Sequence, residues 1–392
     1  MSRDRVVDLL TEWLEDQPSR APESVLRQVL ADVEATPQRA RWRGALGRAL
    51  FPRSPALRLV GAVAAVALAA VIGVAIWRGL SGVIVGPQPG CPMPSAPAEA
   101  RMTEIAVDGY PGYVVFADCS FWVATTTAGT VQRIDALTNE IIATITVGEA
   151  SALPGGVVMA LAVDGDQVWA AARNGFSDRR LVRIDPATNS VVQEIPVQRH
   201  PYSMLILDGR AWLGDFEGNV VSVVDLATGE LVEEVRLGDG PVQIDDGFGA
   251  VWGRSSREMA RVDVQTFEVT RYQVPGRAIY VSVGETGVWS ASPEGGIFKL
   301  SSDGELLVHI ESEPEPVRTA VMDGFVYVGS QFYEPDRMEI MRIDEASGEV
   351  VDRIPFPYGV TELMSAAAGS LWVPAGGEED PRIVRVEVPP AP

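Results

Sequence analysis

Apolar and polar positions alternate in short runs after residue 100, and these runs recur as one unit. Each unit has an apolar run, a short Gly or Asp turn, an aromatic residue, a loop, a basic-aliphatic-acidic triplet and a Thr-Asn or Thr-Gly turn. The aromatic residues are Trp122, Trp169, Trp212, Trp252, Trp289, Tyr327 and Trp372, separated by 47, 43, 40, 37, 38 and 45 positions. A period of about 40 residues built from strand-like pieces is typical of a β-propeller.

The third unit shows how the strands are predicted. Its apolar run 203–207 is followed by Asp208-Gly209 and then by 210–213, and Asp-Gly between two apolar runs indicates a hairpin. Similar turns are predicted at Asp-Gly pairs in three other units, at 164–165, 246–247 and 323–324. Triplets such as Arg133-Ile134-Asp135 predict third strands, in which the charged residues can face out and the aliphatic residue in. Four strands in each of seven units predict an all-β, seven-bladed propeller over residues 101–392.

The last unit ends after its third strand, because little beyond Pro389-Pro390-Ala391-Pro392 follows Val388. The missing strand is found at the other end of the repeat region. Residues 102–109 match the fourth-strand pattern of 143–148. We therefore predict that an N-terminal outer strand completes blade seven and closes the ring without an open edge.

A transmembrane helix is predicted ahead of the propeller. Residues 59–77 are 19 consecutive uncharged, mostly apolar residues, long enough as a helix to cross a hydrocarbon core. A cleaved signal peptide is the alternative, although 58 residues precede this segment. The Arg-rich juxtamembrane segment 37–58 holds six arginines and no acidic residue, which predicts a cytoplasmic N-terminus and an extracytoplasmic propeller at the cell membrane.

Residues 1–36 carry two apolar patterns at helical spacing and predict a small cytoplasmic helical hairpin. A hairpin of this size cannot build a robust core, so we expect it to need a protein partner, the membrane or self-association. The arrangement of hairpin, single span and outer domain resembles that of membrane-bound anti-sigma factors. The zinc-type anti-sigma motif requires His and Cys, and residues 1–58 contain neither.

Charge divides the chain at the same place. Residues 1–58 contain ten arginines and eight acidic residues, whereas the rest of the chain carries 22 basic and 45 acidic groups. A propeller this acidic should repel phosphate backbones, so we expect no nucleic-acid partner. The acidic residues are also those of an ordinary solubilising surface.

The segment 78–100 contains five prolines and four glycines and predicts a semi-extended linker. It holds Cys91, and the only other cysteine, Cys119, replaces the Gly of the first Asp-Gly turn. If residues 102–107 form an outermost strand, Cys91 and Cys119 meet on one face of the ring. A disulfide between them is sterically feasible, and two free thiols are the alternative.

The opposite face carries the loops between second and third strands and the connections between blades, and we call it the distal face. The longest loops lie there, at 173–180, 330–339 and 374–382. Loops on a rigid scaffold commonly carry binding residues, so we expect a protein or small-molecule ligand at this face. The candidate ligand-binding residues at the channel mouth are His200, Tyr202, Gln243, Arg277, Arg318 and Tyr358.

Units such as 165–170 followed by 181–192 resemble the YVTN-type β-propeller repeat, which is similar to WD40-like repeats and also occurs in the virginiamycin B lyase-like superfamily. The resemblance covers about residues 101–392 and implies a fold. Lyases of that superfamily use a histidine general base and a magnesium-bound acidic group. Neither His200 nor His309 lies in a motif that aligns with that base.

The sequence therefore favours a non-catalytic binding or sensing module with no metal, cofactor or catalytic residue. The alternatives are an extracytoplasmic lyase or hydrolase and an anti-sigma-like transmembrane signalling protein. The oligomeric state is left open.

Overall fold

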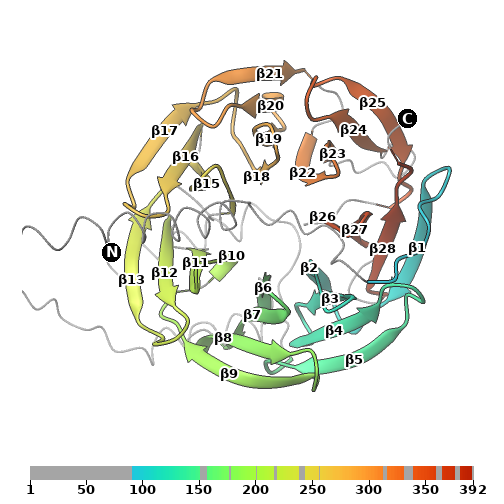
Figure 1. Cartoon of the computed structure of the whole chain (residues 1–392), viewed down its shortest axis with the longest axis vertical. Coiled ribbons are helices and arrows are strands. Elements are labelled where there is room, and N and C mark those ends of the chain that lie inside the picture. Colours follow the sequence, from blue (N-terminus) through green and yellow to red (C-terminus); the bar gives the residue numbers. More distant parts are fainter. Residues whose placement is uncertain are drawn as a thin grey trace, which may run out of the picture. The chain divides into compact units, whose positions relative to one another are not determined.

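Seven four-stranded antiparallel sheets form a ring around a central channel, which confirms the predicted seven-bladed propeller (Figure 1). The computed structural model describes residues 91–390 except 151–156, 176–177, 200, 216–218, 238–242, 256, 312–315, 331–338, 359–363 and 376–379. The predicted hairpin 1–36, juxtamembrane segment 37–58 and span 59–77 lie outside the described residues. Within the described part, no helix is long and apolar enough to cross a membrane.

In each blade the first strand lies beside the channel and the fourth forms the outer rim (Figure 1). Blade one contains β2 (Pro111–Ala117), β3 (Ser120–Thr125), β4 (Thr130–Asp135) and β5 (Ile141–Thr146). Blade two contains β6 (Val158–Asp164), β7 (Gln167–Asn174), β8 (Asp178–Asp185) and β9 (Ser190–Pro196). Blade three contains β10 (Pro201–Leu207), β11 (Arg210–Asp215), β12 (Val220–Asp225) and β13 (Leu231–Arg236).

The remaining blades follow the same plan. Blade four contains β14 (Ile244–Gly247), β15 (Ala250–Ser255), β16 (Glu258–Asp263) and β17 (Val269–Gln273). Blade five contains β18 (Tyr280–Val283), β19 (Val288–Ser292), β20 (Gly296–Leu300) and β21 (Leu306–Ile310). Blade six contains β22 (Pro316–Met322), β23 (Phe325–Ser330), β24 (Glu339–Asp344) and β25 (Val350–Pro355). Blade seven contains β26 (Ser365–Ala367), β27 (Ser370–Ala375), β28 (Arg382–Glu387) and, from the N-terminal side, β1 (Arg101–Ala106).

The ring closes through β1, as the sequence predicts. This strand pairs antiparallel with β28, with Arg101 opposite Glu387 and Ala106 opposite Arg382. The Arg101 guanidinium also donates two hydrogen bonds, of 2.6 and 2.7 Å, to the Glu387 carboxylate. Blade seven is therefore built from both ends of the repeat region and has four strands like the other six blades.

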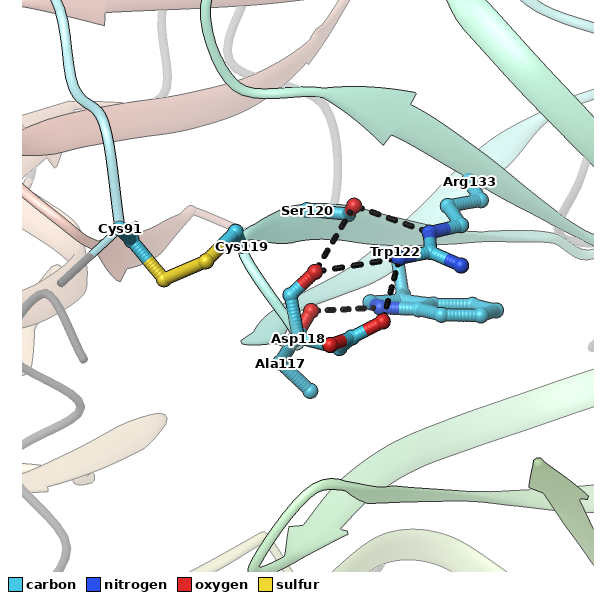
Figure 2. Close-up of a disulfide and its surroundings, with 7 residues drawn as sticks. All are labelled: Cys91, Ala117, Asp118, Cys119, Ser120, Trp122 and Arg133. Carbon is cyan, nitrogen blue, oxygen red and sulfur yellow. Dashed lines mark hydrogen bonds and ion pairs between the residues drawn. A yellow bond between two sulfur atoms is a disulfide. The ribbon is translucent and has the colours of Figure 1, made fainter. Parts of the chain in front are cut away.

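The seven repeated aromatic residues lie on the second strands and are buried in the layers between blades. Six are tryptophans and the seventh is Tyr327, and each is at most 2% exposed. Some of the indole groups also fix the adjacent hairpin turn. Trp122 Nε1, for example, donates a 3.0 Å hydrogen bond to the Ala117 carbonyl (Figure 2). This packing explains why one large aromatic residue recurs in every unit.

The expectation that third-strand charges face outward is wrong for several of the basic residues. Arg385 is 1% exposed and Lys299 is 4% exposed, and both lie over the second-strand tryptophan of their own blade. Arg133 similarly lies over Trp122, with its guanidinium 5.0 Å from the ring centroid. A propeller sheet is covered by neighbouring blades on both faces, so the side opposite the aliphatic residue is also buried.

These basic residues reach the next blade. Arg133 Nη1 donates to the Pro186 carbonyl at 2.7 Å, and Lys299 Nζ donates to the Glu345 carbonyl at 2.7 Å. Both acceptors lie in the turn between third and fourth strands of the following blade. The long side chains thus bury their stems on an aromatic ring and satisfy a carbonyl across the interface between blades.

The hairpin turn predicted at Asp246-Gly247 is also wrong. Both residues belong to β14, and the turn is formed by Phe248 and Gly249, with φ angles of 55° and 69°. Two positive φ angles are required at the centre of this tight hairpin turn, and Gly249 adopts one without strain. Because the turn lies two residues later than predicted, Asp246 belongs to the inner strand and lies beside the channel.

A disulfide joins Cys91 to Cys119, with the two Cα atoms 5.1 Å apart (Figure 2). Cys119 lies at the turn between β2 and β3, and the linked segment contains β1. Beside the disulfide, Asp118 accepts a hydrogen bond from Arg133, which also donates to Ser120 Oγ (Figure 2). The disulfide therefore ties the chain that precedes the closing strand to blade one.

Candidate functional site

The first strands of the blades line a central cavity of about 580 Å³. Its wall includes residues of all seven inner strands, from Tyr113 of β2 to Ser365 and Ala366 of β26. These strands begin at the connections between blades, so their first residues lie at the distal face. The distal end of the cavity is therefore built by residues that come from distant parts of the sequence.

Tyrosine side chains join blades across this end of the channel. Tyr113 in blade one donates a 2.8 Å hydrogen bond to the Tyr202 carbonyl in blade three. The Tyr202 and Tyr280 hydroxyls lie 3.2 Å apart, which links blade three to blade five past the short inner strand of blade four. Arg318 of blade six lies over the Tyr280 ring, with its guanidinium carbon 4.4 Å from the centroid. The mouth is thus bordered by aromatic rings and a cation.

Two further arginines lie at the same mouth. Arg254 is near the distal end of β15 and is 8% exposed, whereas Arg277 precedes β18 and is exposed. Burial lowers the pKa of the Arg254 guanidinium, and the nearby Arg277 charge lowers it further. The Tyr202 and Tyr280 groups have the opposite effect on this pKa. Of the three arginines, Arg318 lines the cavity, whereas Arg254 and Arg277 are not among the lining residues.

Gln243 and Asp245 bind the backbone of the next blade. The Gln243 side chain accepts a 2.7 Å hydrogen bond from the Val281 N–H and donates one of 3.2 Å to the Val281 carbonyl. Asp245 Oδ2 accepts a 2.8 Å hydrogen bond from the Val283 N–H. These contacts connect β14 to β18 much as a neighbouring strand would. Gln243 thus joins blades four and five.

Deeper in the channel lie two carboxyl groups with raised pKa values. Burial, with a contribution from the Asp246 charge, raises the pKa of Asp245 to about 7. Burial alone raises the pKa of Asp246 to about 6. Both residues line the cavity, and part of the surface of each faces its lumen. The protein environment therefore favours the neutral form of both groups.

The structure brings together four of the six residues that the sequence analysis selects. Tyr202, Gln243, Arg277 and Arg318 lie around the distal end of the channel. Tyr358 does not, because its hydroxyl donates to Glu104 on the outermost strand of blade seven. His200 lies outside the described residues. His309 lies on the outer strand β21, where Nε2 is 2.7 Å from the Gly295 carbonyl.

Sequence reasoning missed Arg254, Tyr280, Asp245 and Asp246. The only local signal for Arg254 is its place two residues after Trp252, which puts both side chains on the same face of β15. Asp246 was assigned to a turn because Asp-Gly is so common there. Tyr280 contacts Tyr202, which lies 78 residues earlier in the chain, only because the folded ring places blades three and five close together here.

No protein-family model matches the sequence, and no curated protein matches it. Several solved structures are similar in fold. The WD40 repeats of RRP9 give a TM-score of 0.58 at 12% identity, covering 75% of this chain and 99% of that chain. U3-55K gives 0.58 at 11% identity, with 74% and 98% covered. Hydrazine synthase of Kuenenia stuttgartiensis gives 0.55 at 14% identity, with 77% and 99% covered. Identities this low show a shared fold, and the fold of this chain is accordingly a WD40-like β-propeller.

Proposed function

We propose that this chain is a single-pass membrane protein whose extracytoplasmic propeller binds or senses a ligand at its distal mouth without catalysis. The binding role rests on the polar and aromatic residues at the distal end of the central cavity. The ring of blades places Tyr113, Gln243, Tyr280 and Arg318 on the wall of a cavity of about 580 Å³. The Arg318 guanidinium lies over the Tyr280 ring there. Convergent polar groups over a preformed cavity are the usual form of a ligand site.

The membrane location rests on the sequence. The apolar segment 59–77 and the arginines of 37–58 support one span with the N-terminus inside. The disulfide supports an oxidising compartment for the propeller, because such bonds persist mainly outside the cytosol. In this arrangement residues 1–36 are available to a cytoplasmic protein partner, as in an anti-sigma-like signalling protein.

A topology experiment tests this arrangement. A cysteine introduced at the exposed rim position Leu307 should react with a membrane-impermeant maleimide in intact spheroplasts. A cysteine introduced at Gln28 should react only after the membrane is permeabilised. Labelling of the Gln28 position in intact spheroplasts, or of Leu307 only after lysis, would refute the proposed orientation.

A second candidate function is hydrolase or lyase chemistry in the channel. One observation favours it: Asp245 and Asp246 line the cavity with pKa values raised to about 7 and about 6, the range useful to a general acid or base. The Asp245 carboxylate, however, already accepts backbone hydrogen bonds from Val283 and Asp246. Turnover of a captured ligand by the wild type, lost in Asp246→Asn, would favour this candidate over a binding module.

A further inference from the structure

A groove of about 560 Å³ lies at the rim of the propeller where blade six meets blade seven. It is lined by linker residues 96–98, by Val351 and Asp352 of blade six, and by Pro389 and Pro390 after β28. In the other six blades a short turn joins the third strand to the fourth. Blade seven has no such turn, because β28 and β1 come from opposite ends of the repeat region (Figure 1). The groove lies at this break in the chain.

The linker that forms one wall of the groove is held against the ring. The disulfide fixes Cys91 to blade one, and Arg101 begins the closing strand β1. Between them, Met93 and Ala100 pack against apolar core clusters. Residues 91–100 contain three prolines and form neither helix nor strand. A wall that is already ordered costs a partner little conformational entropy on binding.

Proline determines which hydrogen bonds the groove can form. Pro97, Pro389 and Pro390 have no backbone N–H, so they offer apolar rings and carbonyl acceptors but no donor. A partner must therefore supply donors together with apolar surface. Tryptophan and tyrosine combine the two in one side chain, and aromatic side chains commonly bind proline-rich segments.

An exposed apolar pair borders the groove on blade six. Val350 is 38% exposed and Val351 is 45% exposed. Val351 is an extra residue in β25, because Arg342 lies opposite Asp352 and Ile343 lies opposite Val350. Such a bulge interrupts the outer edge of the blade, so a partner contacts side chains here and does not add a further strand.

Exposed apolar side chains gather on the face that carries the groove, which is the face with the turns between third and fourth strands. In the described part of the chain, every exposed large apolar residue lies in a turn of this face, as Leu137 and Phe248 do, or within the first three residues of an outer strand. Exposed apolar surface concentrated on one face is typical of an interaction surface.

The charge around the groove is acidic. Asp352 lines it, and Glu99 and Glu349 are exposed within two positions of a lining residue. Arg342 also lines it, but this residue is 4% exposed and its guanidinium carbon lies 3.7 Å from the centroid of the Phe325 ring. The acidic groups are therefore the charges that the groove presents to a partner.

Two exposed arginines close to the groove are already paired. Arg101 donates two hydrogen bonds to Glu387, and Arg353 pairs with Glu339. A second copy of this chain or an anionic lipid surface would bring like charges together at this rim. A basic protein surface complements it.

We propose that this groove docks a partner protein through a tryptophan or tyrosine side chain with a basic residue beside it. The aromatic ring packs on the prolines and on Val351, its N–H or O–H donates to a proline carbonyl, and the basic residue pairs with Asp352. The groove and the distal mouth lie on different faces of the ring. The inference therefore adds a second binding surface and does not rest on the proposed function.

The test uses the full-length protein in detergent and a phage-displayed library of random peptides. Phage that bind the wild type are collected, and those that also bind Val351→Asp are removed because they recognise another part of the chain. The peptides that remain should be enriched in tryptophan or tyrosine and should carry lysine or arginine. Their Kd values are then measured by fluorescence anisotropy with synthetic peptides.

Two variants that play no part in the selection check where the peptides bind. Ala98→Trp places a large side chain in the groove and should raise the Kd about tenfold or more. Val232→Asp is the matched control, because Val232 is the corresponding bulge residue of blade three, is 40% exposed and lies across the ring (Figure 1). It should leave the Kd unchanged. The fold should tolerate these changes, since all the substituted side chains are exposed.

Several results would overturn the inference. One is that no peptide remains after the removal step, which is the result expected if the chain covers the groove itself. Another is that the remaining peptides lack aromatic residues, or bind Ala98→Trp as tightly as the wild type. Equal weakening by Val232→Asp would place the peptides elsewhere. A wild-type dimer, or wild-type binding to lipid vesicles, that is lost in Val351→Asp would assign the groove to a second copy or to a membrane.

Discussion

Arg385 Nη1 donates a hydrogen bond of 2.7 Å to Asn139 Oδ1, and this bond joins the last blade to the first. The same nitrogen donates to the Ala136 carbonyl at 2.7 Å, and Arg385 Nε donates to Ser370 Oγ at 3.0 Å. The guanidinium also lies near the rings of Phe121 and Trp372. Two features therefore close the ring. The strand β1 pairs with β28 within blade seven, and the Arg385 side chain joins blade seven to blade one.

Arg385→Met should lower the free energy of unfolding by about 2 to 4 kcal/mol, because the buried Ala136 carbonyl loses its donor. Chemical denaturation monitored by tryptophan fluorescence measures this change. Arg353→Met is the control, since Arg353 is half exposed and pairs with Glu339 on the rim. It should cost less than about 1 kcal/mol, and equal losses in the two variants would contradict the role assigned to Arg385.

The disulfide should stabilise the ring by holding the chain that precedes β1 against blade one. Cys91→Ser and Cys119→Ser should each lower the free energy of unfolding by about 2 to 4 kcal/mol. The double variant should lose no more than either single one, because one bond is removed in all three. Additive losses would mean that the two thiols act separately, and mass spectrometry under non-reducing conditions checks whether the wild-type bond is formed.

Gln243→Ala should destabilise the seam between blades four and five by about 1 to 3 kcal/mol, because the Val281 N–H and carbonyl lose their side-chain partners. Hydrogen exchange at Val281 should rise more than exchange at Val221, a buried residue of blade three. A variant as stable as the wild type, with unchanged exchange at Val281, would leave Gln243 as a ligand-binding residue only.

Asp246 gives the protein a defined pH dependence. Because its folded-state pKa is raised to about 6, the folded protein holds this proton more tightly than the unfolded chain does. Its contribution to stability is complete below about pH 4 and is lost as the pH rises through about 6. Asp246→Asn should therefore be about 1 to 2 kcal/mol more stable than the wild type at pH 8, with little difference at pH 4.

Asp263→Asn should show the opposite dependence of stability on pH. Backbone N–H groups of Thr266 and Gln265 lower the pKa of Asp263, so this carboxylate stabilises the folded protein above about pH 4. The variant should be less stable than the wild type at pH 8. Chemical denaturation of both variants at pH 4 and at pH 8 measures these differences. A loss of stability in Asp246→Asn at pH 8 would contradict the account of Asp246.

Much of the fold could be predicted from the sequence, because each blade repeats the same local pattern. The recurring aromatic residue and the strand-like segment before blade one were enough to predict seven blades and the closing strand. The burial of Arg133 and Arg385 could not be predicted in this way. Strand alternation separates two faces, but it does not show that both faces of a propeller sheet are covered.

The candidate site was only partly predictable, for a related reason. Tyr202 and Arg318 were found because they come just before or within the innermost strands. Their contacts with Tyr280 depend on the ring that brings blades three, five and six together. Tyr358 follows the same sequence rule and yet binds Glu104 at the rim, so position in the unit alone does not define the mouth.

The most direct test of the central claim compares ligand capture at the two faces of the propeller in the native cell. A photo-cross-linking residue is placed at Arg277, beside the distal mouth, or at Arg210, next to the hairpin turn on the opposite face. We predict that a ligand or partner is captured from position 277 and is not captured from position 210. Capture from position 210 alone, or from neither position, would contradict a binding module that works through its distal mouth.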